Sequence, residues 1–300
     1  MRIHSTLPRI QADFTLLLVS IFWGSAFVAQ RVAAQNMSIF LYNALRFLIG
    51  ALVILPFFWR SLKGISRPDK RTLAGVFLAG VCMFGGTTLQ QLGMRFTTAS
   101  SAGFITGLYV VIVPILLGVG LRQAPRRSIW LASLLAAAGL YLLSTQGSFR
   151  LSTGDELVLA GSLLWALHVI MIGWLAGRLE IYPLAIGQYT VCGLLHVVAG
   201  IFFEGGGMFE REVVWLAVLY TSVFSIGLGF TLQAIGQQVA PPADAAIILS
   251  SEAGFAALFG WLILDEKLSA IQLTGCGLML AGMLLAQLTP HRSQIPVESS

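Results

Sequence analysis

The second half of this 300-residue chain repeats its first half. Trp23 is matched by Trp165, 142 positions later, and the Thr-Leu-Gln at 88–90 by the Thr-Leu-Gln at 231–233, 143 positions later. Each half contains five hydrophobic stretches, and because five is odd, a half that crosses a bilayer ends on the side opposite its start. The second half must then insert upside down. Inverted repeats of this kind are typical of secondary transporters, whose substrate site lies near the midplane between the halves.

The composition is that of an integral membrane protein. Hydrophobic residues make up 57% of the chain and charged residues only 10%, whereas a soluble domain carries roughly 25% charged residues. A membrane-spanning helix needs about 20 mainly apolar residues. We therefore expect an all-α integral membrane protein with ten transmembrane helices, arranged as two inverted five-helix repeats at 12–146 and 155–288. The predicted spans are 12–32, 37–58, 72–94, 98–121, 127–146, 155–178, 183–203, 213–236, 242–264 and 270–288.

The basic residues are divided unevenly between the two sides of the membrane. With the spans as predicted, twelve Lys and Arg residues fall on the side of both termini and five on the other side. Because cytoplasmic loops are enriched in Lys and Arg, we expect both termini in the cytoplasm. The net charge of +5 then reflects topology, and nucleic acid is not an expected partner.

Two charged residues are predicted near the middle of their spans, Arg46 in the second and Glu252 in the ninth. A central Arg costs about 2.5–3.5 kcal/mol on the insertion scale, so a partner or a wet cavity must offset it. Tyr42, four residues before Arg46, lies on the same helix face. Three interpretations stay open. The two charges form a static pair, or each has a local partner, or they face a cavity where Arg46 binds a substrate carboxylate and Glu252 an amine or a coupling proton.

Five further polar or aromatic residues are candidates for the same cavity. Trp23 and Trp165 lie at mid-depth instead of at the membrane interface, and each indole N–H needs a partner there. Gln90 and Gln233 occupy mirror positions, as cavity walls or gates would, although bonds between helices explain them equally well. A cavity lined by Trp23, Trp165, Tyr42 and Tyr109 would favour an aromatic or amphipathic cargo.

Local signals predict where some helices begin and bend. Thr153-x-x-Glu156 and Ser269-x-x-Gln272 match a capping box, which satisfies the free amides at a helix start. Pro114 removes a helical hydrogen bond within the fourth span and predicts a kink there. The segment 145–154, rich in Ser, Thr and Gly, is the expected hinge between the halves.

The sequence offers no cofactor or metal site. Cys82, Cys192 and Cys276 lie in separate spans without CxxC spacing, which favours buried small side chains over disulfide or metal chemistry. His168 and His196 are expected near mid-depth, where a polar packing role is commoner than ligation of haem iron. No nucleotide-binding Walker motif is present, so ATP as the energy source would require another chain.

Several short segments have an informative order and spacing. Phe-Trp-Gly-Ser begins at 22, and the others lie at 45–48, 96–100, 240–246, 249–252 and 260–269. Together they resemble the EamA-type families of the drug/metabolite transporter superfamily over nearly the whole chain. The chain departs from that pattern at Ala253, where many relatives have Pro, and at Gln123, where the first repeat often has Glu.

The resemblance implies a secondary transporter that exports a small metabolite, such as an amino acid, across the bacterial inner membrane by alternating access. It also implies that the first four helices of each half surround a cavity and that the fifth helices buttress it. The expected partners are a small-molecule substrate and the lipid bilayer; monomer and homodimer both stay open. The alternatives are an intramembrane enzyme acting on a lipid-soluble substrate, and a structural subunit.

Overall fold

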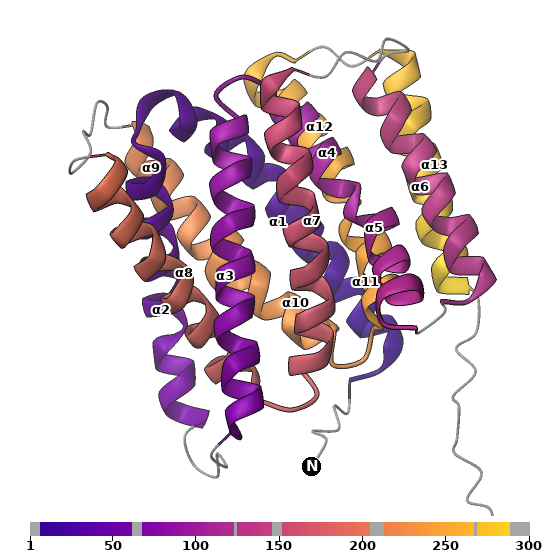
Figure 1. Ribbon diagram of the computed structural model, residues 1–300. Coiled ribbons are helices and arrows are strands. Elements are labelled where there is room, and N and C mark those ends of the chain that lie inside the picture. The colour runs from indigo at the N-terminus through magenta and orange to yellow at the C-terminus, as the bar shows by residue number, and fades with distance from the viewer. Residues whose placement is uncertain are drawn as a thin grey trace, which may run out of the picture.

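The computed structural model describes residues 7–61, 68–122, 125–145, 152–204, 213–266 and 269–288. The regular elements within these ranges are all helices (Figure 1), as the composition predicts. The first half contains α1 (Arg9–Asn36), α2 (Ile39–Ser61), α3 (Lys70–Gly93), α4 (Ala99–Gly107), α5 (Tyr109–Ile115), η1 (Leu116–Gly120) and α6 (Arg127–Thr145). The second half contains α7 (Thr153–Leu175), α8 (Ile181–Phe203), α9 (Val213–Tyr220), η2 (Thr221–Phe230), α10 (Thr231–Gly236), α11 (Pro242–Leu249), α12 (Glu252–Leu264) and α13 (Ala270–Leu288).

Eight helical stretches of the described chain are long and apolar enough to cross a bilayer, each of 21 to 28 residues. The chain is therefore an all-helical integral membrane protein. The remaining two predicted spans correspond to α6 and α13, whose apolar stretches at 127–139 and 270–282 are shorter. Eight of the ten expected spans thus meet the length and composition of a membrane helix within the described residues.

Three of the predicted spans are not single α-helices. The span at 98–121 is interrupted at Leu108, between α4 and α5, and its Pro114 is followed by the π-helical η1. The span at 213–236 passes from α9 through the π-helical η2 into α10. The span at 242–264 is interrupted by a turn at Ser250 and Ser251, after which α12 begins at Glu252. Irregular backbone at membrane depth is tolerated only where protein or a cavity surrounds it, which directs attention to these breaks.

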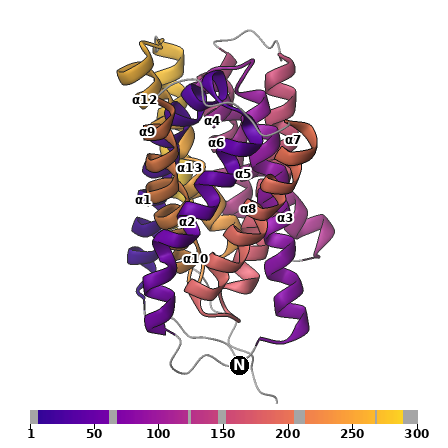
Figure 2. The same cartoon turned by 90° about the vertical axis from the view of Figure 1, so that its left-hand side faces the viewer.

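Helices from the two halves pack against one another. The most extensive helix–helix contacts join α2 to α8, α3 to α7, and α6 to α13 (Figures 1 and 2). The α6–α13 pair stands at one side of the molecule, on the right in Figure 1, beside the rest of the bundle. A cavity between the halves is consequently walled by the remaining helices.

One of the two predicted capping boxes agrees with the structure. The side chain of Gln272 accepts from Ser269 N (2.7 Å), and the main-chain N–H of Gln272 donates to Ser269 Oγ (3.3 Å), as a capping box requires. Pro114 lies inside α5, two residues before the π-helical η1 begins. The box at α7 was placed one residue too late, because Ser152 caps the helix and Asp155 returns the bond. The hinge at 145–154 falls largely outside the described residues, as do Gln123 and the side chain of Cys276.

At the start of α3, outside the membrane segments, Asp69 plays the same capping role. Its carboxylate accepts from Thr72 N at 2.7 Å. Hydrogen bonds from Thr72 hold the pKa of the Asp69 carboxyl below its ordinary value.

Two glycines related by the 143-residue shift set the approach of α6 to α13. A Cβ on Gly139 would lie 2.4 Å from Gly275 O, and one on Gly282 would lie 2.7 Å from Ala132 O. Each glycine therefore faces the backbone of the other helix. Small residues at such points allow the close packing that replaces the hydrophobic drive within lipid.

We predict that Gly139→Ala destabilises the protein by about 1–3 kcal/mol, because the added methyl group must push two helix backbones apart. The thermal midpoint of purified protein in detergent measures the effect. Gly277→Ala is the matched control, since nothing lies within 4 Å of a Cβ at Gly277, and it should be neutral or slightly stabilising. Equal effects of the two substitutions would contradict the packing argument.

Candidate functional site

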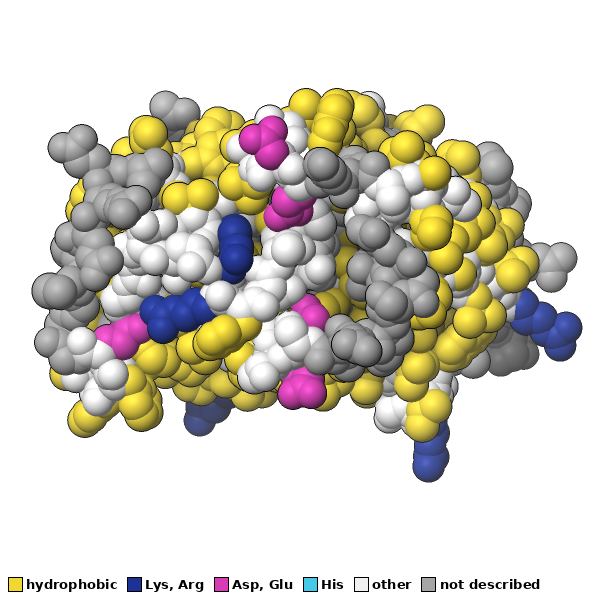
Figure 3. Space-filling model, turned by 90° about the horizontal axis from the view of Figure 1, so that it is seen from above, with side chains coloured by type: hydrophobic (Ala, Val, Ile, Leu, Met, Phe, Trp, Pro, Cys, Tyr) yellow, Lys and Arg dark blue, Asp and Glu magenta, His cyan; other side chains and the backbone are white. Residues whose placement is uncertain are grey.

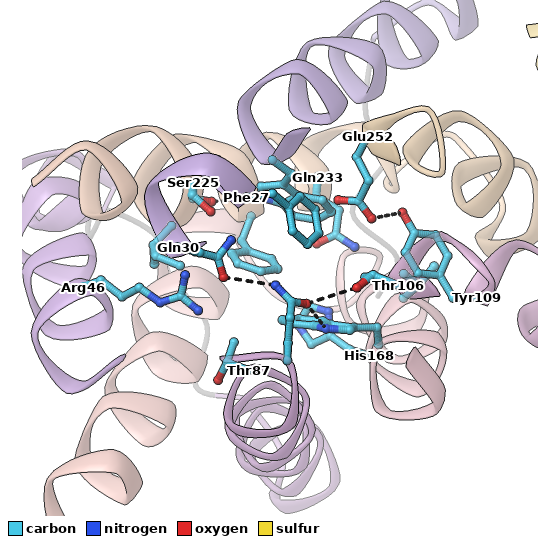
Figure 4. Close-up of a pocket in the computed structure, with 16 residues that line it drawn as sticks. Phe27, Gln30, Arg46, Thr87, Thr106, Tyr109, His168, Ser225, Gln233 and Glu252 are labelled. Atoms are coloured by element: carbon cyan, nitrogen blue, oxygen red, sulfur yellow. Dashed lines mark hydrogen bonds between the residues drawn. The ribbon is translucent and has the colours of Figure 1, made fainter. Parts of the chain in front are cut away.

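A cavity lies between the two halves, with about 470 Å³ of space including its open mouth. Seven of the eight residues predicted for a substrate site line it (Figure 4). Tyr42 is the exception. The lining residues come from both halves of the chain: Trp23, Phe27, Gln30, Arg46, Thr87, Gln90, Thr106, Tyr109, Trp165, His168, Val169, Ser225, Ile226, Phe230, Gln233 and Glu252.

Arg46 is only 2% exposed and is held by aromatic rings. Its guanidinium carbon lies 5.1 Å from the centroid of the Tyr42 ring and 5.2 Å from that of Phe47, which are cation–π distances. Tyr42 is itself fixed by a 3.0 Å hydrogen bond between its hydroxyl and that of Thr221. Tyr42 therefore supports Arg46 without lining the cavity. Nε of Arg46 has no hydrogen-bond partner among the described residues.

Glu252 is 3% exposed and pairs with Tyr109, which donates its hydroxyl to Oε1 at 2.9 Å. The two residues are 143 positions apart, the shift that aligns the repeats. Each is the first residue of a helix that resumes after a break, α5 and α12 respectively. The N-terminal end of a helix favours negative charge through its free amides and its dipole. The Glu252 carboxyl group is held by the Tyr109 hydroxyl, so the two repeats meet at this hydrogen bond.

Arg46 and Glu252 project from opposite sides of the cavity (Figure 4). In the part of the chain that the structure describes, no ion pair joins them; the ion pairs found there involve Arg9, Asp13, Asp244 and Arg126 instead. A static pair between Arg46 and Glu252 is therefore not the arrangement observed. The cavity has a cationic end and a carboxyl end.

A hydrogen-bond network crosses the cavity wall between these ends. Trp165 Nε1 donates to Gln90 Oε1 at 2.9 Å, and Gln90 Nε2 donates to Gln30 Oε1 at 3.0 Å. Thr106 Oγ1 lies 3.4 Å from the same oxygen of Gln90. The predicted roles of Gln90 as a cavity wall and as a link between helices are thus combined in one side chain. Gln30 was not predicted, although its place within an apolar span is a usable signal.

Aromatic rings form the other wall. The Phe230 ring lies 4.6 Å from that of Trp23 and 5.7 Å from that of Trp165, centroid to centroid. Trp23 Nε1 donates to the main-chain oxygen of Ser225 at 3.0 Å, so both indole N–H groups have partners. Phe230 was missed because one Phe in an apolar span gives no signal of its own.

The two histidines occupy separate polar sites. His168 Nε2 lies 2.8 Å from Gln188 Oε1 at the cavity wall. His196 Nε2 lies 3.1 Å from Thr88 Oγ1, and its Nδ1 lies 2.9 Å from Cys192 O. These contacts fit polar packing.

The two ends of the bundle are held by different interactions. Near the start of α1, at the bottom in Figure 1, Arg9 bridges Asp13 (2.8 Å) and Asp244 (2.9 Å), and Arg126 joins Asp244 at 3.0 Å. We call these four residues the arginine–aspartate cluster.

At the opposite end, carboxylates accept from helix-start amides. Glu204 accepts from Ile39 N (2.8 Å) and Phe40 N (3.0 Å) at the start of α2, and Glu266 accepts from Ala99 N (3.3 Å) at the start of α4. Figure 3 looks down on this end, where acidic and basic side chains lie among polar ones with apolar side chains around them.

We predict that Asp244→Asn lowers the free energy of unfolding by about 1–3 kcal/mol, because two guanidinium groups lose their shared partner. The figure is modest since the side chains of Arg9 and Arg126 are 33% and 28% exposed. Thermal unfolding at low and high salt measures it. Asp13→Asn is the matched control. It should lower the free energy of unfolding less, because Arg9 still pairs with Asp244. A larger loss of stability for Asp13→Asn than for Asp244→Asn would refute the central place of Asp244.

A family model matches both halves of the chain, and the curated relatives are transporters. A model of the EamA-like transporter family matches residues 10–145 and again residues 152–288. An uncharacterised transporter of Archaeoglobus fulgidus is 33% identical over 93% of this chain and 87% of its own length. The threonine/homoserine exporter of Escherichia coli K12 is 27% identical over 83% of this chain and 82% of its own length. One solved crystal structure has the same fold, with a TM-score of 0.76 and 18% identity over 94% of this chain and 98% of its own.

Proposed function

Because this chain belongs to the EamA-like transporter family, we propose that it is a secondary transporter that exports an amino acid or a similar zwitterion by alternating access. The observation that carries the choice of cargo is the cavity with Arg46 at one end and Glu252 at the other. The transporter relatives favour this reading over an intramembrane enzyme.

An α-amino acid carries the two charges that this cavity is equipped to receive. Its carboxylate would bind the guanidinium group of Arg46, whose planar pair of donors matches the two carboxylate oxygens. Its ammonium group would bind the carboxyl group of Glu252. A buried charge without a partner is costly at membrane depth, so a cargo with both charges is favoured over a simple anion or a simple cation.

The wall between the charged ends suits an apolar or amphipathic body on the cargo. Trp23, Trp165 and Phe230 present their rings there. Aromatic faces offer large contact areas at little cost in conformational entropy. They would contact the carbon skeleton of the cargo while its charged groups lie at the two ends.

Alternating access would use the two halves as inverted five-helix repeats, at 12–146 and 155–288. Support comes from the family match in each half, from the reciprocal glycines of α6 and α13 and from the pairing of Tyr109 with Glu252, its repeat mate. The breaks at Leu108 and at Ser250–Ser251 adjoin the cavity, and there the halves of each span can rotate with little loss of helical hydrogen bonding.

The location follows from the charges and the family together. We place the protein in the bacterial inner membrane with both termini in the cytoplasm, as the Lys and Arg distribution favours. The arginine–aspartate cluster is then at the cytoplasmic end, and the end shown in Figure 3 faces outward.

Protons are the coupling ion that the site favours. A buried carboxyl at Glu252 would bind either the cargo's ammonium group or a proton, but not both. Competition for one group gives exchange, in which an inward proton drives the cargo outward. Tyr109 would hold the carboxyl in place through both steps.

We predict that purified protein is stabilised against heat by at least one amino acid, and that Arg46→Ala abolishes this shift. Arg46→Lys should weaken binding at least about tenfold, since an ammonium group lacks the bidentate fork. Arg178→Ala is the control, because Arg178 lies 4.3 Å from the Trp174 ring outside the cavity. An unchanged response in Arg46→Ala would remove the assigned role.

We predict that Glu252→Gln abolishes the response of transport to an imposed pH gradient in proteoliposomes, while exchange of cargo across the membrane continues at a reduced rate. Tyr109→Phe should keep the pH response, because the carboxyl is retained. The measurement is uptake of a radiolabelled amino acid that passes the thermal screen. Wild-type transport that ignores the gradient would exclude proton coupling.

A further inference from the structure

The two repeats differ at one pair of side chains that faces the cavity. Trp165 and Gln90 are joined by a 2.9 Å hydrogen bond from the indole N–H to Gln90 Oε1. The repeat mates of these residues are Trp23 and Gln233. They are not joined, because Trp23 donates instead to the main-chain oxygen of Ser225 in η2, at 3.0 Å. Gln233 therefore lacks the donor that its mate Gln90 has.

The hydrogen bonds around Gln233 fix which of its atoms is left without a partner. Val169 O can only accept, so Gln237 must direct its Nε2 there, at 2.9 Å. Gln237 then offers Oε1 to Gln233, which donates Nε2 to it at 2.9 Å. The remaining atom of the Gln233 amide is its oxygen. It is buried and has no hydrogen-bond partner among the described residues.

A second buried acceptor lines the same cavity. His168 is fully buried, and its Nε2 is engaged with Gln188 Oε1 at 2.8 Å. With a proton on Nε2, Nδ1 is an acceptor, and it too has no partner among the described residues. The His168 ring lies 5.6 Å from that of Phe230, three residues before Gln233. Both residues line the cavity (Figure 4), and each carries a buried acceptor atom that has no partner among the described residues.

We propose that Gln233 Oε1 accepts a hydrogen bond from an uncharged donor on the side chain of the cargo, so that the transporter selects an amino acid with a hydroxyl or amide group over its apolar isostere. This inference rests on the proposed amino-acid cargo. The donor from the cargo takes the place at Gln233 that the indole N–H of Trp165 takes at Gln90. His168 Nδ1 is the second acceptor within the same subsite.

The chemistry excludes other donors. A cationic side chain needs a counter-charge, and in this cavity the carboxyl of Glu252 is already assigned to the cargo's α-ammonium group. An apolar side chain leaves the Gln233 oxygen without a partner in a water-poor site. A site that hydrogen-bonds the polar group of a ligand strongly rejects the isostere without that group. An apolar pocket rejects a ligand with an added hydroxyl group less strongly.

The test compares threonine with valine, which have the same shape but differ by a hydroxyl in place of a methyl group. Binding of each to the purified full chain is measured by thermal shift and by competition. We expect wild-type protein to prefer threonine at least about tenfold, the ratio that one hydrogen bond of about 1.4 kcal/mol provides. Gln233→Met should remove this preference, so that threonine and valine bind equally.

Gln91→Met is the matched control. Gln91 is also buried with an unpartnered Oε1, and its Nε2 donates to Gln30 O at 2.9 Å, but it does not line the cavity. The preference for threonine should survive in this variant. O-methylthreonine tests the same point without any substitution, since it keeps the oxygen and loses the hydrogen. It should bind wild-type protein no better than valine.

Three outcomes would overturn the inference while leaving an amino-acid cargo in place: equal binding of threonine and valine by wild-type protein, a threonine preference that survives Gln233→Met, and an equal loss of both ligands in that variant. The last result would mean that the Gln233 amide serves the protein alone. Failure of folded wild-type protein to bind any amino acid would instead overturn the proposed function itself.

Discussion

The burial of charge at membrane depth is the constraint on which this architecture depends. In lipid, an ionised side chain or a free backbone group without a partner is costly. Arg46 meets this constraint with the faces of two aromatic rings, and Glu252 with the Tyr109 hydroxyl. Neither solution uses the opposite charge across the cavity. Both charges consequently stay available to a bound molecule, and the interrupted spans are tolerated because they border the space where that molecule would lie.

The repeat relation explains what is rigid and what is specific in this protein. Gly139 and Gly282 make equivalent contacts between α6 and α13, with the main-chain oxygens of Gly275 and Ala132, and the repeat mates Tyr109 and Glu252 contact each other directly. Such contacts form a common framework in both halves. The cavity wall departs from the relation, because the indoles of Trp23 and Trp165 donate to different kinds of acceptor. The π-helical η2 supplies the carbonyl group responsible. A symmetric framework thus carries an asymmetric lining, which a cargo without internal symmetry requires.

Much of the site could be predicted from the sequence because membrane depth makes polar residues conspicuous. Arg46, Glu252 and Gln90 stand out within apolar spans, and the repeat identifies the paired tryptophans. The position of Tyr42 could not be resolved, since residues four apart share a helix face whether they line a cavity or lie behind its lining. The break at Ser250–Ser251 was also missed. Neither residue is a strong helix breaker, and the interruption depends on contacts with other helices, such as the bonds from Ser20 Oγ to the main-chain oxygens of Ile248 (3.0 Å) and Leu249 (3.3 Å).

The two ends of the bundle are closed by chemically different interactions, and this difference bears on how the halves move. At the end with Arg9, the guanidinium groups of Arg9 in α1 and of Arg126 just before α6 both pair with Asp244 in α11, so opening there must separate ions. At the other end, Glu204 after α8 and Glu266 after α12 accept from the amides at the starts of α2 and α4, so opening there breaks hydrogen bonds to neutral donors. Exposed ion pairs become cheaper to separate once water reaches them. Under the proposed alternating access, entry of water at the Arg9 end would therefore promote further opening there, as a two-state transition requires.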